Sequence, residues 1–501
     1  MKILSALQIR EADSYTIKSQ SINSAKLMER AGDACFKWIY KNINNGKKYC
    51  VICGTGNNGG DGLVIARKIA ENKLPVEVII LQFSSTHSSD FTKNLETLSS
   101  IPVNLRFLKE GEDLLLENDV ILIDAILGTG LNKPVGDWLE RCIDKMNENG
   151  SEIISIDIAS GLFSDTHTNG KSVMPNHTLT FQCPKLAFFL AENAENVGRF
   201  HVLDIGLDEK FIESRDSNRY FYDEREIKRL LKPRGKFTHK GTYGHGLLIS
   251  GSKGKMGASV LAARACLRTG VGLLTVHAPE CGYDILQTSI PEAMVETDIN
   301  NEIVTSLNEI EKYNSIGIGP GIGKSEQTKK MFFELLENIT KPIVVDADAL
   351  NILSDEKVKI KKLPPYSILT PHPKEFERLA GKCNDDFERH IIQQRFSSTN
   401  NVIVVLKGAY TCITIPDGRT FFNSTGNPGM AKAGSGDVLT GMILALLCQG
   451  YEPKDAAILG VYLHGLAGDL LVIKKGVYSM LASDLIESIP KAFRRLIKDV
   501  S

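Results

Sequence analysis

Two glycine-rich turns that each end in a carboxylate lie far apart in this chain. The first runs from Gly54 to Gly62 and carries Asn57, Asn58 and Asp61, and the second runs from Gly426 to Asp437. Each precedes an apolar run of helical character, so backbone N–H groups and a helix N-terminus can face an anion. The two turns therefore predict two separate active sites in one chain.

Two later strand ends carry polar groups that can converge on the first turn. Asp124 follows the apolar run 120–123, and Asp157 and Ser160 follow the run 153–156. The carboxyl ends of parallel strands meet in one crevice of an open sheet, so these groups can meet Asn58 there. The alternative is that each aspartate only caps the loop or helix that follows it.

The second turn has the features of a phosphate cradle. Gly434, Ser435 and Gly436 can present backbone N–H groups at a helix N-terminus. A carboxylate next to a phosphate is costly unless amides, the helix dipole or a metal offset it, so Asp437 indicates proton transfer with a substrate hydroxyl. The alternative is a glycine-rich helix start with a capping aspartate.

Three further residues have more than one interpretation. His372 lies between two prolines, and we expect it to contact substrate, although a packed loop residue would look the same. Asp346 and Asp348 either bind Mg²⁺ through water or hydrogen-bond to neighbouring loops.

Bulk composition narrows the class of protein. The 501 residues allow roughly two to four domains. The chain has 59 basic and 60 acidic residues and a formal charge of −1, so it has no overall field for nucleic acid or an anionic membrane, and we expect a small-molecule substrate. The amino terminus is not a secretory signal and no apolar run approaches membrane-spanning length, so we expect a cytoplasmic protein. The ten cysteines form no disulfide framework.

Continuous apolar runs alternate with helical stretches in both halves, which is typical of parallel sheets covered on both faces. The predicted strands of the first half are 49–53, 76–81, 120–123, 153–156 and 179–181. Those of the second half are 246–250, 273–277, 315–318, 343–346, 367–369 and 402–406, followed by an antiparallel pair, 412–415 and 420–422. The stretch 207–220 is polar and has no predicted strand, so we place a domain boundary near residue 217.

The motifs Gly-Asn-Asn-Gly-Gly-Asp-Gly, Asp-Ala-Ile-Leu-Gly-Thr-Gly and Asp-Ile-Ala-Ser-Gly resemble the epimerase domain of the NAD(P)H-hydrate repair enzymes. The resemblance implies a Rossmann-like three-layer α/β domain over residues 1–217, with Asp157 as the acid/base. It implies K⁺ ligands at Asn58, Asp124 and Ser160. It implies that the hydrated dinucleotide contacts Asn57, Asn58, Gly59, Gly60, Asp61, Gly128, Thr129, Gly130, Leu131, Asn132, Lys133, Pro134 and Asp157. The family usually has proline where this chain has Ala159.

The motifs around Lys240–Gly244, Gly319–Gly323, Val345–Leu350, Leu369–Glu375 and Val405–Thr411 resemble a ribokinase-like α/β domain, and more closely the NAD(P)H-hydrate dehydratases, over residues 218–501. The resemblance implies substrate contacts at Gly321, His372, Pro373, Lys374, Glu375, Phe376, Glu377, Arg378 and Asp437. It implies ADP contacts at Lys407, Gly408, Ala409, Tyr410, Thr411, Asn427, Pro428, Gly429, Met430, Ala431, Lys432, Ala433, Gly434, Ser435 and Gly436. It implies Asp437 as the catalytic residue and Mg²⁺ at this site. Ala433 stands where the family usually has glycine.

The function implied by both resemblances is metabolite repair. The first domain would interconvert the R and S epimers of hydrated NADH or NADPH, and the second would dehydrate the S epimer while converting ADP to AMP. The resemblance also implies a homo-oligomer. Two alternatives stay open: a ribokinase-like kinase of a small alcohol such as a vitamin precursor or sugar, and a first domain that only binds nucleotide or protein.

Overall fold

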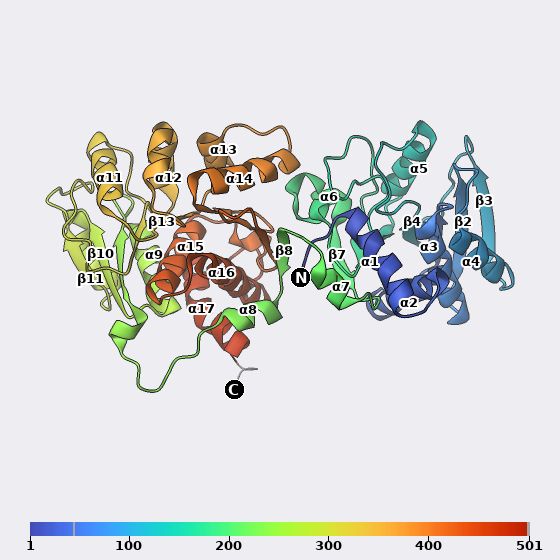
Figure 1. Cartoon of the computed structure of the whole chain (residues 1–501), viewed down its shortest axis with the longest axis horizontal. Helices are drawn as coiled ribbons and strands as arrows, with labels where there is room; N and C mark the ends of the chain where they lie inside the picture. The colour runs from blue at the N-terminus through green and yellow to red at the C-terminus, as the bar shows by residue number, and fades with distance from the viewer. Residues whose placement is uncertain (44–45, 498–501) are drawn as a thin grey trace. The chain divides into compact units, whose positions relative to one another are not determined.

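The computed structural model of the protein describes residues 1–43 and 46–497 and divides the chain into two compact units (Figure 1). The N-terminal unit comprises Met1–Ser217 together with the short stretch Asp385–Phe387. The C-terminal unit comprises Asn218–Asn384 and the chain from Glu388 onward. Each unit is built around its own sheet, so each is treated separately below.

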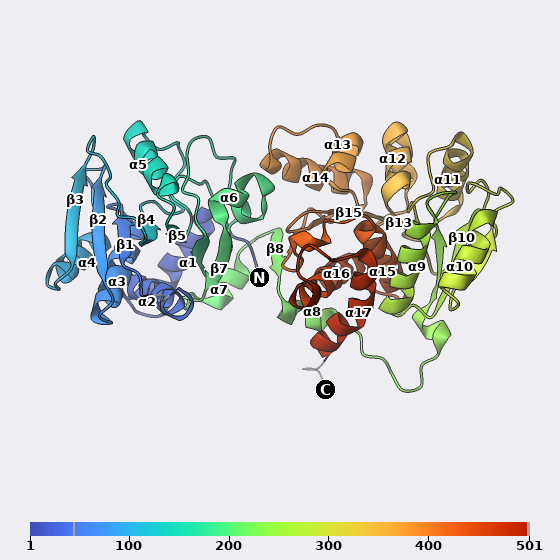
Figure 2. The same ribbon diagram turned by 180° about the vertical axis from the view of Figure 1, so that it is seen from behind.

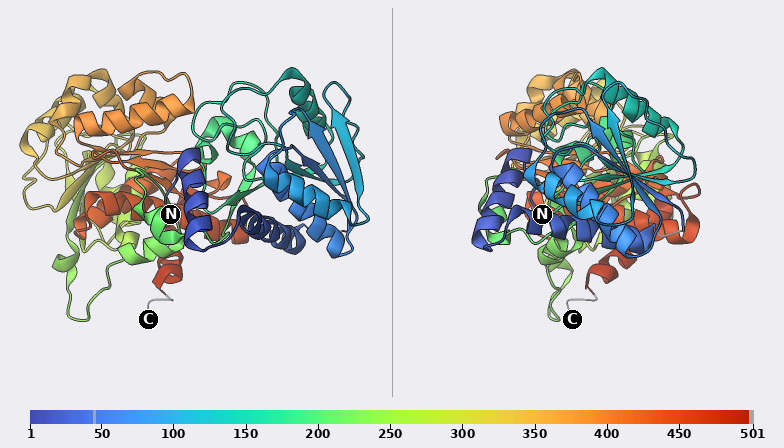
Figure 3. Two further views of the ribbon diagram at one scale, coloured as in Figure 1. Left: turned by 45° about the vertical axis from the view of Figure 1, so that its right-hand side comes forward. Right: turned by 90° about the vertical axis from the view of Figure 1, so that its right-hand side faces the viewer.

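The N-terminal unit holds a seven-stranded sheet in the order β3-β2-β1-β4-β5-β6-β7, and the described strands all pair in parallel. The strands are β1 (Tyr49–Cys53), β2 (Val76–Gln82), β3 (Asn104–Lys109), β4 (Ile121–Ala125), β5 (Glu152–Ile156), β6 (His177–Phe181) and β7 (Arg199–Leu203). The α-helices are α1 (Ala6–Ser19), α2 (Ser24–Asn42), α3 (Asn57–Glu71), α4 (Ser89–Ser99), α5 (Asp137–Glu148), α6 (Ala194–Val197) and α7 (Glu209–Ser214). In Figure 3 the strands lie between the teal helix α5 on one side and the blue helices α3 and α4 on the other.

The central strands are buried as their continuous apolarity predicts. Every residue of β1 and β4 is buried, and alternate side chains of both strands belong to one apolar core of this unit. Two strands of this unit were not predicted: β3, at one sheet edge, has one buried residue among exposed and half-buried ones, and β7, at the other edge, is exposed or half-buried throughout. Edge strands lack the apolar run that marks a strand covered on both faces.

The C-terminal unit holds a ten-stranded mixed sheet in the order β11-β10-β9-β12-β13-β14-β15-β16-β17-β8. The strands are β8 (Arg219–Tyr222), β9 (His245–Ile249), β10 (Leu273–Ala278), β11 (Met294–Thr297), β12 (Ser315–Ile318), β13 (Val344–Val345), β14 (Ile368–Leu369), β15 (Ile403–Leu406), β16 (Cys412–Thr414) and β17 (Thr420–Asn423). The predicted antiparallel pair is confirmed, because β16 pairs antiparallel with both β15 and β17. The other described pairs of this sheet are parallel.

The helices of this unit cover both faces of the sheet. They are α8 (Glu224–Leu230), α9 (Met256–Thr269), α10 (Tyr283–Ser289), α11 (Glu326–Asn338), α12 (Ala347–Asp355), α13 (Pro373–Ala380), α14 (Asp386–Asn400), α15 (Ser435–Cys448), α16 (Pro453–Lys475) and α17 (Ala482–Ile497). Figures 1 and 2 both show α11 to α14 on one side of the sheet and α9, α15, α16 and α17 on the other. The largest apolar core lies between the sheet and the second group.

Two sequence-based expectations are wrong. The stretch 207–220 was expected to hold no strand, but β8, a strand of four half-buried residues, begins within it at Arg219. The same stretch also holds α7 of the N-terminal unit. An apolar segment of membrane-spanning length also exists: the 23-residue helix α16 is long and apolar enough by length and composition, and 72% of its most apolar window is buried within the protein. Its side chains pack in the core, so its apolarity is that of a central helix.

Candidate active sites

The first glycine turn is the opening turn of a helix packed against the sheet. The helix α3 begins at Asn57, so most of the segment from Gly54 to Gly62 belongs to the helix and is not a loop that precedes it. A side chain at Gly59 would place its Cβ 1.9 Å from the Gly54 carbonyl oxygen, and one at Gly62 would meet Ala125 at 2.6 Å. The glycines therefore allow the helix start to press against the ends of β1 and β4.

A cavity of about 670 Å³ opens at the carboxyl ends of these strands. The predicted substrate-binding residues that line it are Asn57, Asn58, Asp61, Gly128, Thr129, Gly130, Leu131, Asn132, Lys133 and Asp157. The predicted residues that do not line it are Gly59, Gly60 and Pro134. The strand ends therefore converge as an open parallel sheet requires.

Asn58, Asp124 and Ser160 meet beside this cavity around the backbone of Leu127. The Asp124 carboxylate accepts hydrogen bonds from the Ser160 hydroxyl at 2.5 Å, the Ser160 amide at 2.8 Å and the Ser155 hydroxyl at 2.7 Å. The Leu127 amide donates to the Ser160 hydroxyl at 2.9 Å, and its carbonyl accepts from the Asn58 side chain at 2.9 Å. Burial raises the pKa of Asp124, while the bonds from Ser160 oppose that rise. The three residues form one oxygen-rich cluster.

Asp157 lies in a left-handed conformation and is held by a buried lysine. Its φ is +65°, which is uncommon for a residue other than glycine. The Lys185 ammonium, whose side chain has no exposed surface, lies 2.5 Å from the Asp157 carboxylate and donates to the Thr180 hydroxyl at 2.6 Å. Asp157 itself is 13% exposed and faces the cavity. This ion pair fixes the position of Asp157.

Sequence reasoning missed two residues of this site, Lys185 and Asp13. Lys185 is the one charged residue in the run Cys183 to Leu190, and a lone lysine among apolar residues was an available signal. Asp13 lies on α1 and lines the cavity. Burial raises the pKa of Asp13 to about 7, and the Asp157 charge adds to the rise while Lys185 opposes it. Burial also raises the pKa of Asp61, with further contributions from Asp157 and Asp13.

The second glycine turn leads into α15 through a left-handed cap. Gly434 caps the helix with a φ of +89°, and Ser435, Gly436 and Asp437 form its first turn. A Cβ at Gly436 would lie 3.4 Å from the Lys407 ammonium and 3.7 Å from an oxygen of Asp346. Burial raises the pKa of Asp437 to about 7, and Asp346 contributes to the rise while Lys407 opposes it.

Asp346 and Lys407 form a polar group beneath this helix start. The Lys407 ammonium lies 3.0 Å from one oxygen of Asp346, and the Thr440 hydroxyl donates to the other oxygen at 2.7 Å. Burial works against ionisation of Asp346, but Lys407 and Thr440 hold the pKa of Asp346 below its usual range. Asp348 pairs with Lys255 at 3.2 Å and accepts from a backbone amide at 2.9 Å. Both aspartates are therefore bound to neighbouring protein groups.

The helix α16 contacts the second glycine turn near both ends of the turn, and the sequence did not predict these contacts. Its Asp469 carboxylate accepts from the Gly426 amide at 2.9 Å and from the Asn427 side chain at 3.0 Å. The buried His464 lies 3.3 Å from the Ser435 hydroxyl. Burial lowers the pKa of His464 to about 4, so its imidazole is neutral near pH 7. The turn is thus anchored at both of its ends.

His372 has a structural role that the sequence left open. It caps α13, where its ring accepts from the Glu375 amide at 3.3 Å and its own amide donates to the Glu375 carboxylate at 2.8 Å. Glu375 in turn lies 3.9 Å from Lys407, so the segment that begins α13 meets the polar group under α15. Phe376 is fully buried in the core and presents no surface to a substrate. Gly321 has a φ of +68°, and a Cβ there would meet the Lys255 carbonyl at 2.9 Å.

The remaining predicted nucleotide contacts lie on two surface segments. Gly408 and Ala409 are exposed and Lys407, Tyr410 and Thr411 half-buried, in the connection between β15 and β16. Residues 427–434 lie in the connection between β17 and α15, within which Gly429 is buried and Ala433 exposed, and Ser435 and Gly436 begin α15. Ala159, the departure in the first site, is buried at the end of β5.

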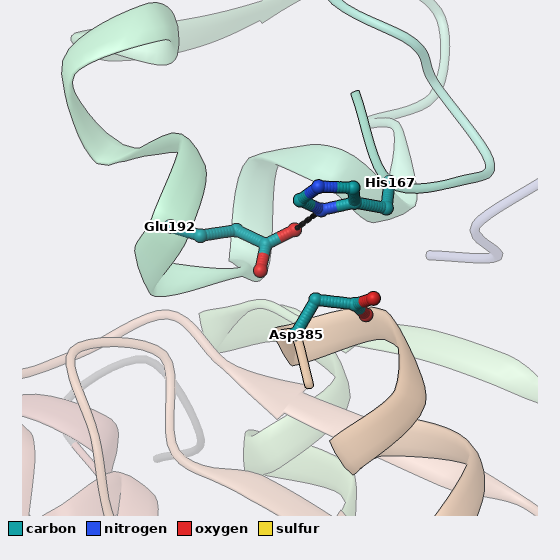
Figure 4. A group of neighbouring side chains, drawn as sticks. All are labelled: His167, Glu192 and Asp385. Carbon is teal, nitrogen blue, oxygen red and sulfur yellow. Dashed lines mark hydrogen bonds and ion pairs between the residues drawn. The ribbon is translucent and has the colours of Figure 1, made fainter. Parts of the chain in front are cut away.

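A further group of possible metal ligands lies outside both sites. His167, Glu192 and Asp385 of the N-terminal unit each place one ligand atom within 4.8 Å of the others (Figure 4). His167 is bonded to Glu192 at 2.9 Å, and this bond raises the pKa of His167. A protonated His167 imidazole can supply the positive charge that Glu192 and Asp385 would otherwise take from a metal ion. Exposed acidic groups are also common without a bound ion.

Comparison with known proteins shows the family of the chain. The family model described as NAD(P)H-hydrate dehydratase matches residues 246–491, and the YjeF-related N-terminal model matches residues 24–187. The bifunctional NAD(P)H-hydrate repair enzyme Nnr of Moorella thermoacetica is 35% identical over 523 residues, covering 100% of this chain and 98% of the relative. The chain belongs to the bifunctional NAD(P)H-hydrate repair enzymes.

Other members and one solved structure agree with this placement. The repair enzyme Nnr of Thermofilum pendens is 32% identical and covers 100% of this chain and 97% of the relative. A ribokinase-like superfamily protein of Enterococcus faecalis is 27% identical, with a TM-score of 0.50 over 56% of this chain and 98% of that chain. The predicted α/β folds are therefore confirmed, and the repair-enzyme family explains why one chain carries two glycine turns.

Proposed function

We propose that this chain repairs hydrated NADH and NADPH in two steps. The N-terminal unit interconverts the R and S epimers, and the C-terminal unit dehydrates the S epimer while ADP becomes AMP. The observation that carries the proposal is that the YjeF-related match lies within the N-terminal unit and includes its cavity-facing Asp157, while the dehydratase match lies within the C-terminal unit, apart from residues 385–387, and includes its helix-start Asp437. An epimerase joined to an epimer-specific dehydratase returns both forms of the damaged cofactor.

In the proposed epimerase site the cavity holds the hydrated ring, and Asp157 exchanges protons with its hydroxyl group or with water. The carboxylate is suited to this because Lys185 fixes it while its side chain still reaches the cavity. The segments 57–61 and 128–134 would hold the rest of the dinucleotide. These contacts supply the orientation on which the step depends.

We propose that Asn58, Asp124 and Ser160 hold K⁺ beside the cavity. An amide oxygen, a carboxylate and a hydroxyl are hard oxygen donors. The Ser160 hydroxyl lies against both the Asp124 carboxylate and the Leu127 amide, and the Asn58 side chain reaches the Leu127 carbonyl through its amide nitrogen. The residues therefore fit a hard cation. Bound K⁺ would supply positive charge that keeps the buried Asp124 ionised and orients an oxygen of the substrate.

In the proposed dehydratase site the phosphoryl group of ADP moves to the C6 oxygen of the hydrated ring. Asp437 accepts the proton of that hydroxyl, the bond to the β-phosphorus forms, and AMP leaves. Loss of the C5 proton and departure of inorganic phosphate then restore the dihydropyridine. The amides of residues 434–436 and the ammonium of Lys407 would stabilise charge on the phosphoryl oxygens.

We propose that Mg²⁺ accompanies the nucleotide phosphates at this site. Asp346 and Asp348 are each paired with a lysine, Lys407 and Lys255, so we propose that they contact Mg²⁺ through water and not as direct ligands. We also propose that the protein is cytoplasmic and forms a homo-oligomer. Size-exclusion chromatography with light scattering is the direct test of the oligomeric state.

The deciding experiment is recovery of dihydronicotinamide absorbance when the protein meets both NADHX epimers with ADP, ATP or neither. We expect full recovery that requires a nucleotide. Asp157→Ala should limit rapid recovery to one epimer, and Asp437→Asn should abolish it. If neither nucleotide gives recovery and a small alcohol is phosphorylated instead, the kinase alternative replaces the proposal.

A further inference from the structure

The cavity of the N-terminal unit holds a second carboxyl group whose surroundings differ from those of Asp157. Asp13 projects from α1 into the same 670 Å³ cavity that Asp157 reaches from the end of β5. The two residues therefore come from different elements and approach the same space. A hydroxyl group at a ring carbon that is to be inverted needs one proton donor and one proton acceptor.

Lys185 distinguishes the two carboxyl groups. Its buried ammonium lies 2.5 Å from Asp157, which compensates a negative charge there. Asp13 has no hydrogen bond or ion pair to Lys185 within the described contacts, and it is half-buried, close to the carboxylates of Asp157 and Asp61. Like charges this close disfavour ionisation of Asp13, which has no cation paired with it in the described contacts, whereas Asp157 has the Lys185 ammonium as its partner. The other ionisable residues that line the cavity are Arg10, Asp90 and Lys133.

We infer that Asp13 is the general acid of the epimerase and that the lysine-paired Asp157 is its base. The inference rests on the proposed epimerase function of this unit. It adds a catalytic residue on the first helix of the chain, outside the segments 57–61 and 128–134 and the strand-end residues that the sequence motifs indicate.

Asp13 supplies the proton that the inversion consumes, and Asp157 accepts the proton that the inversion releases. The Asp13 carboxyl gives its proton to the C6 hydroxyl, the C6–O bond breaks, and water leaves with the bonding electrons. The ring nitrogen lone pair forms the N1=C6 double bond of an iminium ion. Water then adds to C6 from the opposite face, its proton passes to the Asp157 carboxylate, and the electrons of the double bond return to nitrogen. One proton exchanged with solvent restores the pair.

The closing test compares Asp13→Asn, Asp13→Glu and Glu11→Gln in the full-length protein. Asparagine has the shape of the protonated carboxyl but donates no acidic proton, and Glu11 lies on the same helix outside the cavity lining. We expect Asp13→Asn to lower kcat for interconversion of the NADHX epimers about 10²–10⁴-fold with little change in KM. Asp13→Glu should recover part of that loss, and Glu11→Gln should match the unsubstituted protein.

Two further readouts separate an acid from a structural residue. The epimerase rate should fall as pH rises through about 7, and that alkaline limb should be absent from the residual rate of Asp13→Asn. A ¹³C NMR titration of labelled aspartate should show one resonance with a midpoint near this pH that Asp13→Asn removes. Epimerisation in H₂¹⁸O should place solvent oxygen at C6 on every inversion.

Three results would overturn the inference. They are an Asp13→Asn variant with a tenth or more of the normal rate, an alkaline limb that survives this substitution, or inversion without solvent oxygen. If the unsubstituted protein does not interconvert the epimers at all, it is the epimerase function that fails. The two failures are therefore distinguishable.

Discussion

The Lys407 ammonium lies 3.0 Å from the Asp346 carboxylate, directly beneath the first turn of α15. Asp346 is almost fully buried, with 2% of its side chain exposed, whereas 23% of the Lys407 side chain is exposed. The absence of a side chain at Gly436 leaves the ammonium accessible from the helix start. Asp346 thus holds a cation next to the first turn of α15.

Replacing Asp346 by asparagine should destabilise the C-terminal unit by about 3 kcal/mol, because removing one partner of a buried ion pair leaves the other charge uncompensated. The measurement is urea unfolding followed by a probe in this unit. Asp348→Asn is the matched control. Its pair with Lys255 is more exposed and should contribute less than about 1 kcal/mol.

Adding Lys407→Met to Asp346→Asn should recover part of the lost stability, because the uncompensated charge is then removed. Equal losses for Asp346→Asn and Asp348→Asn would contradict a special role for the buried pair. A double variant whose loss of stability exceeds the sum of the two single-variant losses would also contradict that role.

The dehydratase rate should rise with pH through about 7, because Asp437 must be ionised to accept the substrate proton and its pKa is raised to about 7 by burial and Asp346. Single-turnover rates with the S epimer and ADP across this range measure the limb. Asp437→Asn should lose about 10²–10⁴-fold in rate at every pH. A rate that does not change between about pH 5.5 and pH 8.5 would show that Asp437 is not the titrating base.

Asp437 should also make the stability of the C-terminal unit depend on pH. Its folded pKa of about 7 lies above the usual 3.8, so the folded state binds the proton more tightly and stability falls as pH rises from about 4 through about 7. Asp437→Asn removes this dependence. The variant should match the unsubstituted protein near pH 4 and exceed it by up to about 4 kcal/mol near pH 8 in urea unfolding. A variant that is less stable at both pH values would contradict this assignment.

The central strands and the aspartates at their ends could be predicted from the sequence because neighbouring residues in the chain identify them. A strand buried on both faces, such as β1, is continuously apolar, and Asp124 and Asp157 follow such strands directly. The strands β3 and β7 were missed because edge strands carry mixed polarity. Asp13, Lys185 and Asp469 were missed for a different reason. Their partners lie in other elements, and no spacing along the chain reveals which helix will cover which loop.

The support that α16 gives to the second glycine turn leads to a prediction about two glycines of that helix. A Cβ at Gly465 would lie 2.4 Å from the Thr425 hydroxyl and 2.6 Å from the Thr425 carbonyl carbon, so the backbone of the turn would have to move. A Cβ at Gly468 would meet the Met430 sulfur at 2.4 Å, and a flexible methionine side chain can move away. The two positions therefore test backbone and side-chain contact with the same loop.

We expect Gly465→Ala to raise the KM for ADP about tenfold or more and to lower the unfolding free energy by about 1–3 kcal/mol, because overpacking displaces the loop that would hold the nucleotide. Gly468→Ala should change both quantities much less. Alanine improves helix propensity by up to about 1 kcal/mol at either position, so the difference between the variants isolates the loop contact. Steady-state kinetics and urea unfolding on the two proteins measure it. If both variants bind ADP equally well, α16 does not set the position of the turn.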